Sequence, residues 1–385
     1  MLCGLACASA RASFTTPARS AFLIDPASGM TLVNKEADAL MPPSSMLKLM
    51  TLAMIFDAVK DGALSLDQRL PVSGNADHRR PVWAPASKLC LERGQEVSVR
   101  DIIMGLIVMS GGDAGVVAAE HLAGSEIDMA ARMTLRAREI GMERSTFGNV
   151  SGLFHPDNLM TSRELAVLAQ YLINEHPDFF PWFAERRFEF EGYEGDWCRE
   201  WGRLRARTYN RLLFQMPGAE GLKTGRTSEG GFGMVAVARR GDRRLIGVIN
   251  GLMQAKDHNA LAREARRLLE YGFDTTENRT FFNPGDVVVQ IPAWYGRRRT
   301  INATVENPFV VTLPRGKGTA GLRILARYYD PTVTTVRAGD KVGEIIAEFE
   351  GRVVKRAPLV ARERVGRVIF YGRIAKNLQV IFRGR

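Results

Sequence analysis

The chain lacks any uninterrupted apolar run of about eighteen residues, so no segment has the sequence of a helix that spans a membrane. Cysteine is also scarce, and among 385 residues only Cys3, Cys7, Cys90 and Cys198 occur. No spacing between them fits a metal site. We expect neither a bound metal nor another cofactor. Cys90 and Cys198 are able to pair in an oxidising compartment, but the sequence leaves open whether they do.

No stretch of the chain interleaves basic and aromatic residues, which is the pattern of a nucleic-acid-binding surface, so we expect no nucleic acid partner. The net charge is nevertheless +11, and only ten of the 53 basic residues are lysines. Two interpretations of the arginine excess stay open. Either the source proteome is rich in arginine, or the protein meets an anionic partner such as a membrane surface or a cell wall.

The length of 385 residues exceeds what one compact core usually holds, and it predicts two domains. In residues 14–280, hairpin-like strand pairs at 21–33 and 232–249 alternate with helical patterns, among them an amphipathic helix at 258–273. In residues 281–366, short β-like runs are separated by glycine or proline about every ten residues, as in an all-β sandwich. We therefore predict an α+β fold, with helices around an antiparallel sheet and a small β-sandwich domain after it.

Both ends of the chain carry patterns of their own. Residues 1–13 are small and apolar and look like the end of a secretory signal peptide, although a positively charged first part is missing. A frayed cytosolic N-terminus is the alternative. Residues 367–385 place apolar side chains at helical spacing among five basic residues, which is typical of an amphipathic helix on a membrane surface. The alternative is a terminal helix or strand packed on the preceding domain.

Ser45 and Lys48 carry the most information about chemistry. Two prolines precede them and predict a helix start with Ser44 as its cap, so the hydroxyl and the amine lie one turn apart on one face. Residues 47–56 are nearly all apolar, which predicts that this helix is buried. Burial lowers the pKa of a lysine, and a neutral amine can accept the proton of a serine. The alternative is a structural helix start whose lysine reaches solvent.

Two later segments favour the catalytic interpretation. Ser98 predicts the start of a helix that ends at Met109, and Asp113 is placed to cap the next helix, so Ser110 lies in a loop between them. Residues 221–226, Gly-Leu-Lys-Thr-Gly-Arg, lead into a strand-like apolar run. A Ser-x-x-Lys motif, a serine loop and Lys-Thr-Gly in this order are the signature of penicillin-binding proteins and class A β-lactamases.

With these motifs the chain resembles the D-alanyl-D-alanine carboxypeptidases among the low-molecular-mass penicillin-binding proteins. The likeness covers about residues 14–385. It also rests on Asn149 with Gly152-Leu153, Asn210-Arg211-Leu212-Leu213, Tyr329-Asp330-Pro331 and Ala357-Pro358-Leu359-Val360-Ala361. The resemblance implies a penicilloyl-serine-transferase (β-lactamase-like) first domain, peptidoglycan stem peptides as substrates and β-lactam antibiotics as covalent inhibitors. It further implies a periplasmic location with peripheral attachment to the inner membrane through residues 367–385.

The resemblance assigns the catalytic roles. Ser45 attacks the peptide carbonyl between two D-alanines, neutral Lys48 is the general base, and Ser110 relays the proton to the leaving amine. The backbone N–H groups of Ser45 and Arg226 are expected to form the oxyanion hole.

A second set of residues is expected to bind substrate. Lys223 and Thr224 hold the terminal carboxylate, and Gly225 lets the strand approach the substrate closely. Arg211 and Arg226 are candidates for further carboxylate binding, and the alternative for each is a solvated surface arginine.

Gly112 departs from the family pattern. Relatives usually carry asparagine there, whose amide can hold the substrate carbonyl and hydrogen-bond the active-site lysine. Missing hydrogen bonds of this kind cost about 1–3 kcal/mol, so we expect Gly112→Asn to raise turnover by up to about 10- to 100-fold. Two alternatives to a carboxypeptidase therefore stay open. One is a catalytically weakened scaffolding protein, and the other is a β-lactamase, against which the second domain argues.

Overall fold

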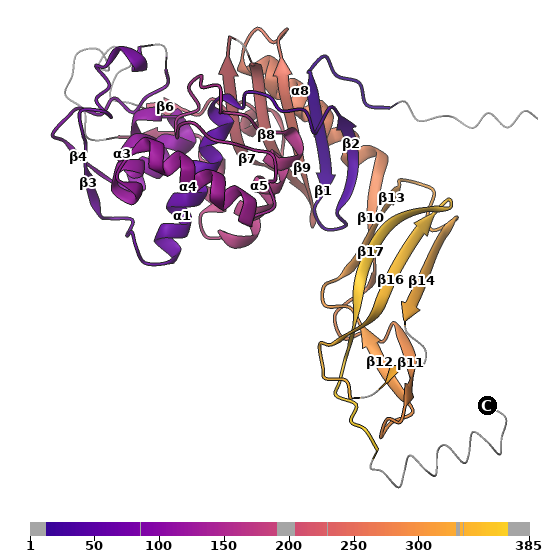
Figure 1. The fold of residues 1–385 in the computed structure, drawn as a ribbon. Helices are drawn as coiled ribbons and strands as arrows, with labels where there is room; N and C mark the ends of the chain where they lie inside the picture. Colours follow the sequence, from indigo (N-terminus) through magenta and orange to yellow (C-terminus); the bar gives the residue numbers. More distant parts are fainter. Residues whose placement is uncertain are drawn as a thin grey trace, which may run out of the picture. The chain divides into compact units, whose positions relative to one another are not determined.

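The computed structural model describes six stretches of the chain: residues 13–84, 86–190, 205–228, 230–328, 332–333 and 335–368. The chain forms two compact units, the first made of Met1–Ile24 and Thr31–Phe273, and the second of Asp25–Met30 and Asp274–Arg385. The first unit combines helices with an antiparallel sheet and the second is built from strands, so the predicted α+β fold is confirmed (Figure 1). Almost all of the two predicted terminal segments lies outside the described residues, as do Cys198 and the Tyr329-Asp330-Pro331 motif.

The first unit is organised around a five-stranded antiparallel sheet with the order β2-β1-β9-β8-β7. Its strands are β1 (Ser20–Asp25), β2 (Met30–Lys35), β7 (Ala219–Thr227), β8 (Gly231–Arg240) and β9 (Arg243–Leu252). Both predicted hairpins, β1–β2 and β8–β9, are present. Two short strand pairs lie outside this sheet: β3 (Arg69–Pro71) with β4 (Glu96–Ser98), and β5 (Arg187–Glu189) with β6 (Arg205–Arg207).

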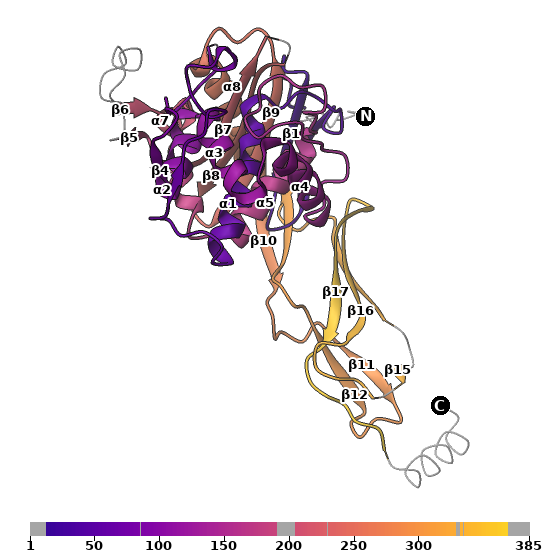
Figure 2. The same cartoon turned by 60° about the vertical axis from the view of Figure 1, so that its left-hand side comes forward.

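Helices cover both faces of the sheet (Figure 2). The helices are α1 (Lys48–Lys60), α2 (Val99–Met104), α3 (Gly112–Ala123), α4 (Glu126–Glu139), α5 (Ser162–Glu175), α7 (Leu212–Gln215) and α8 (His258–Thr275). Short helical turns are η1 (Ser44–Leu47), η2 (Pro81–Trp83), η3 (Gly105–Met109) and η4 (Phe180–Ala184). Alternate residues of β8 divide between two cores: Val235 and Val237 pack with the helices α1 to α5, whereas Met234 and Ala236 pack with α8.

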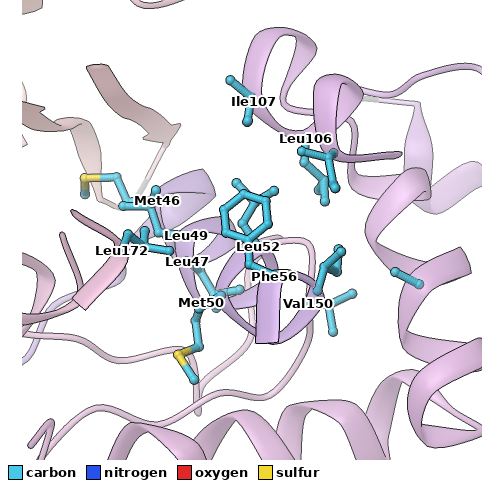
Figure 3. Close-up of a cluster of buried hydrophobic side chains, with 14 of the residues drawn as sticks. Met46, Leu47, Leu49, Met50, Leu52, Phe56, Leu106, Ile107, Val150 and Leu172 are labelled. Carbon is cyan, nitrogen blue, oxygen red and sulfur yellow. The ribbon is translucent and has the colours of Figure 1, made fainter. Parts of the chain in front are cut away.

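The helix α1 is buried along most of its length, as the apolar run 47–56 predicts. Figure 3 shows its side chains among Leu106 and Val150 on one side and Leu172 on the other. The predicted cap at Ser44 is wrong, because the chain enters the helix through the turn η1 and Ser44 is that turn's first residue. Burial of the whole helix start replaces the cap as the element that fixes it.

The predicted helix from Ser98 to Met109 is present in two parts. The hydroxyl of Ser98 accepts the N–H of Asp101 and caps α2, as predicted. The last turn, η3, is π-helical and ends at Ser110, which takes a left-handed conformation with φ 61° and ψ 30°. None of the described helices is long and apolar enough to cross a membrane.

The second unit consists of strands in its described part, so its predicted all-β character is confirmed. Its strands are β10 (Thr276–Phe282), β11 (Val289–Trp294), β12 (Thr300–Thr304), β13 (Phe309–Pro314), β14 (Leu322–Tyr328), β15 (Thr332–Val333), β16 (Lys341–Phe349) and β17 (Arg352–Ala361). They form a six-stranded sheet, β14-β16-β17-β12-β11-β15, and the pair β10–β13. Side chains from both sheets, such as Ile345 and Val311, share one core.

Candidate active site

Ser45 and Lys48 lie where η1 passes into α1. The Nζ of Lys48 is 2.9 Å from the Oγ of Ser45 and also donates to the carbonyl oxygen of Ser151. Lys48 is only 2% exposed, and this burial lowers its pKa to about 7, although the negative charges of Asp113 and Glu126 oppose the shift. Near neutral pH much of this amine is therefore uncharged and able to take the proton of the half-buried Ser45 hydroxyl.

Ser110 and Lys223 form the second pair of the site. The Nζ of Lys223 donates to the Oγ of Ser110 at 2.9 Å and to the carbonyl of Thr224 at 3.1 Å. Both side chains are buried. Burial and the charge of Lys48 together hold the pKa of Lys223 well below its usual value. A carboxylate beside Lys223 would raise this pKa again, so protonation of Lys223 and binding of an anion would favour each other.

The loop that carries Ser110 is held by hydrogen bonds to a segment distant in the sequence. The Asp113 carboxylate accepts the N–H groups of Leu89 and Leu91 at 2.7 and 3.1 Å. The predicted role of Asp113 as a helix cap is wrong, because α3 begins one residue earlier and Gly111 holds the cap position. Cys90, between the two donors, is disulfide-bonded. Cys198, whose pairing with Cys90 the sequence leaves open, lies outside the described residues.

Gly225 brings β7 against the start of α1. A Cβ at this position would lie 2.9 Å from the carbonyl oxygen of Pro43 and 3.1 Å from the N of Ser45. The missing side chain of Gly225 thus lets β7 pack closely against the backbone of Pro43 and Ser45, while its predicted approach to the substrate stays a prediction.

Comparison with known proteins agrees with this geometry. Residues 7–256 match the family model of the D-alanyl-D-alanine carboxypeptidases, peptidase family S11. The chain belongs to the D-alanyl-D-alanine carboxypeptidase family. Residues 277–367 match the C-terminal domain of penicillin-binding protein 5. The protein is a serine-type D-Ala-D-Ala carboxypeptidase, and neither a scaffolding protein nor a β-lactamase gains support from these matches.

The similarity extends over most of the chain. D-alanyl-D-alanine carboxypeptidase DacC of Escherichia coli is 31% identical over 93% of this chain and 86% of its own length. The structure of penicillin-binding protein 5 from Haemophilus influenzae has a TM-score of 0.82 at 25% identity, and covers 92% of this chain and 99% of that one. Penicillin-binding protein D2 from Listeria monocytogenes, solved in an ampicillin-bound form, has a TM-score of 0.58 at 26% identity and covers 68% of this chain and 100% of that one.

Arg211 and Arg226 share a neighbourhood with Lys223 and His258 in the carboxypeptidase. Arg226 is exposed above the ring of Phe232. Together with Lys223, both arginines help lower the pKa of His258 to about 4, although burial of that imidazole is the larger cause. His258 was not predicted, and its place at the start of the predicted helix 258–273 gave no sign of this neighbourhood. The three positive charges therefore converge near His258, and a role of the two arginines in binding a carboxylate stays a prediction.

Gly112 is where the structure revises a sequence-based expectation. It is buried, and a Cβ at this position would lie 2.7 Å from the indole of Trp83 and 3.2 Å from the Cβ of Ser151. An asparagine therefore has no room unless Trp83 moves, so we now expect Gly112→Asn to lower turnover instead of raising it. Trp83 and Ser151 were not predicted site residues. Trp83 lies in a stretch that reads as irregular, and Ser151 contributes a backbone carbonyl, which no side-chain pattern reveals.

Proposed function

We propose that this carboxypeptidase removes the terminal D-alanine from peptidoglycan stem pentapeptides through an ester on Ser45. The observation that carries the proposal is the buried Lys48 amine, 2.9 Å from the Ser45 hydroxyl and with a pKa of about 7. A surface lysine would remain charged at neutral pH and could not act as a base. The pairing therefore supports a nucleophile activated by its neighbour.

The reaction begins with the transfer of the Ser45 proton to Lys48 as Oγ attacks the carbonyl between the two D-alanines. The N–H groups of Ser45 and Arg226 stabilise the oxyanion. Collapse of the tetrahedral intermediate breaks the C–N bond, and the leaving amine takes a proton from Ser110, which Lys48 then replaces. Because Lys223 donates to the Oγ of Ser110, the Ser110 hydrogen is free to point elsewhere. In the second half, Lys48 takes a proton from a water molecule as its oxygen attacks the ester carbonyl. The C–O bond to Ser45 then breaks, and the protonated Lys48 gives that proton to the Ser45 Oγ.

The carboxylate of the terminal D-alanine is assigned to Lys223 and Thr224 on β7. Arg211 and Arg226 add positive charge at this end, which the lowered pKa of His258 reflects. An internal peptide has no free carboxylate there, so this arrangement supports specificity for the end of the stem peptide. β-Lactam antibiotics carry a carboxylate next to a strained amide, and we assign them the same site as covalent inhibitors. The ampicillin-bound relative supports this assignment.

The test is to measure D-alanine release from a D-Ala-D-Ala pentapeptide beside the acylation by, and release of, penicillin. We expect repeated turnover of the peptide and slow release of penicillin from the enzyme. A protein that binds penicillin but never releases D-alanine would be a scaffold. One that turns over penicillin faster than the peptide would be a β-lactamase.

We further propose that the protein works in the periplasm, attached to the inner membrane through its C-terminal segment. The disulfide at Cys90 supports an oxidising compartment. Residues 366–368 pair with the β domain, since the N–H of Arg297 donates to Gly366 and the N–H of Val368 donates to Tyr295. We therefore assign the attachment to the membrane to residues 369–385. This segment begins two residues after the predicted boundary between the β-sandwich domain and the anchor, which lay at 366/367.

Deleting residues 369–385 is expected to abolish binding to anionic lipid vesicles and to leave activity unchanged. Each apolar side chain of the segment contributes up to about 1.5–3 kcal/mol when buried in lipid, and each basic one about 1 kcal/mol near an anionic surface. Vesicle co-sedimentation measures the binding, and high salt should weaken it. Equal binding of the full and shortened chains would show that these residues do not form the anchor.

A further inference from the structure

Trp83 is the residue on which this inference rests. Its indole is 2% exposed and belongs to the core that surrounds α1. The outer atoms of its six-membered ring lie against Gly112, with Cζ3 2.7 Å and Cη2 3.4 Å from the point where a Cβ would stand. The same point is 3.2 Å from the Cβ of Ser151. The indole therefore fills a space bounded by the Ser110 loop and by Ser151.

Ser151 and the Ser110 loop, which bound this space, each hydrogen-bond one of the two lysines of the site. The carbonyl of Ser151 accepts a hydrogen bond from Lys48, and Ser110, two residues before Gly112, accepts one from Lys223. Trp83 is itself fixed in place: its Nε1 donates to the carbonyl of Asn75 at 3.3 Å. A rigid ring wedged at this point holds both segments in position.

We propose that Trp83 is a positioning residue for Lys48. Trp83 acts through Ser151, and its indole fits only because residue 112 is glycine. The inference rests on the proposed function in one respect, because it takes Lys48 as the base. It assigns Trp83 no contact with substrate. The indole keeps Ser151 packed against the amine and so keeps water away from it. This loss of hydration holds Lys48 in its neutral form at neutral pH, whereas the Ser151 carbonyl by itself would favour the charged amine.

The test is a cycle of variants at Trp83 and Gly112. Phenylalanine lacks the outer indole atoms, so Trp83→Phe leaves a void, whereas Gly112→Ala adds a methyl that meets the indole. Gly112 has no positive φ, so alanine fits its backbone. The double variant Gly112→Ala/Trp83→Phe places the methyl in the void. We expect each single variant to lower the melting temperature and the penicillin acylation rate, and the double variant to recover both.

Gly115→Ala is the matched control. It makes the same change on the same helix, but its Cβ would lie 3.4 Å from its nearest neighbour, which is ordinary contact. We expect it to leave acylation unchanged. Two results would contradict the proposal. In the first, Gly112→Ala leaves acylation unchanged, as Gly115→Ala does. In the second, the double variant shows the combined losses of the two single variants and recovers neither the melting temperature nor the acylation rate.

The pH profile of acylation separates positioning from mere packing. The charged groups that act on Lys48 are Asp113 and Glu126, and Lys48 in turn acts on Lys223. None of these groups is changed by Trp83→Phe. Because water gains access to Lys48 in that variant, we expect the midpoint of the acid limb to rise by about one pH unit, so that acylation at pH 6 falls about tenfold. Trp182→Phe, whose described ring contacts are Phe179 and Arg100, should leave the midpoint in place.

Each outcome addresses one of the two proposals. A wild-type enzyme that penicillin does not acylate contradicts the proposed function. The melting temperatures of the two single variants and the double variant then still test whether the Trp83 indole packs against Gly112. An active wild-type enzyme whose midpoint stays unchanged in Trp83→Phe contradicts the positioning role.

Discussion

Replacing Ser45 with alanine is expected to abolish covalent labelling by a fluorescent penicillin and to leave the fold intact. Its Oγ is the atom that the Lys48 amine approaches at 2.9 Å, and without it no ester can form. The side chain is only half-buried, so losing one oxygen costs little stability. Labelling is read on a denaturing gel, and circular dichroism checks the fold.

The exposed Ser65 provides the matched control for this experiment. Ser65→Ala should be labelled as strongly as the wild type. Labelling of the Ser45→Ala variant at the wild-type level would show that another residue is the nucleophile.

Replacing Lys48 with methionine is expected to slow acylation about 10²- to 10⁴-fold, the usual effect of a general base. Methionine keeps much of the lysine's volume but cannot accept a proton. Stopped-flow mixing with a chromogenic β-lactam measures the rate. Lys60→Met lies on the same helix at an exposed position and should leave the rate unchanged. A rate in Lys48→Met within a few-fold of the wild type would exclude this lysine as the base.

The same substitution is expected to stabilise the protein at acid pH. The pKa of Lys48 is about 7 in the folded protein against 10.5 in the unfolded chain. Between these values the unfolded chain binds more protons, so this lysine makes the wild-type stability rise with pH, by at most about 1.4 kcal/mol per pH unit. The methionine variant lacks this dependence. Its advantage is therefore largest below pH 7 and disappears as pH approaches 10.5, which denaturant titrations at several pH values can measure.

The acylation rate of the wild-type enzyme should follow the fraction of Lys48 that is in its neutral form. The rate is expected to rise from pH 5 to 8 and to level off above the pKa of Lys48, because only the neutral amine is a base.

Much of the fold follows from local patterns in the sequence. The cap at Ser98 and the apolar face of α8 each depend on residues a few positions apart, so both could be predicted. The failed caps at Ser44 and Asp113 mark the limit of this reasoning. Both lie in buried active-site turns, where tertiary contacts take over: Asp113 bonds to the backbone of Leu89 and Leu91, more than twenty residues away.

The site could be predicted as far as its chemistry depends on side-chain type. Ser45, Lys48, Ser110 and Lys223 were predicted from motifs, and the structure brings each serine to a lysine. Trp83 could not be predicted, because its role depends on a missing Cβ that lies 29 positions further along the chain. For this reason the expected effect of Gly112→Asn on turnover changed from an increase to a decrease. The sequence shows which hydrogen bonds an asparagine could make, but not that a distant indole occupies the space it needs.

The most direct measurement is to trap the acyl-enzyme with the natural class of substrate. The enzyme is mixed with a D-Ala-D-Ala pentapeptide, quenched in acid within milliseconds and digested with trypsin, and the fragment of residues 36–48 is sequenced by mass spectrometry. The account predicts an ester of the peptide on Ser45 that lacks one D-alanine, with one D-alanine released for each ester formed. Release of D-alanine with no ester, or an ester on another residue, would contradict it.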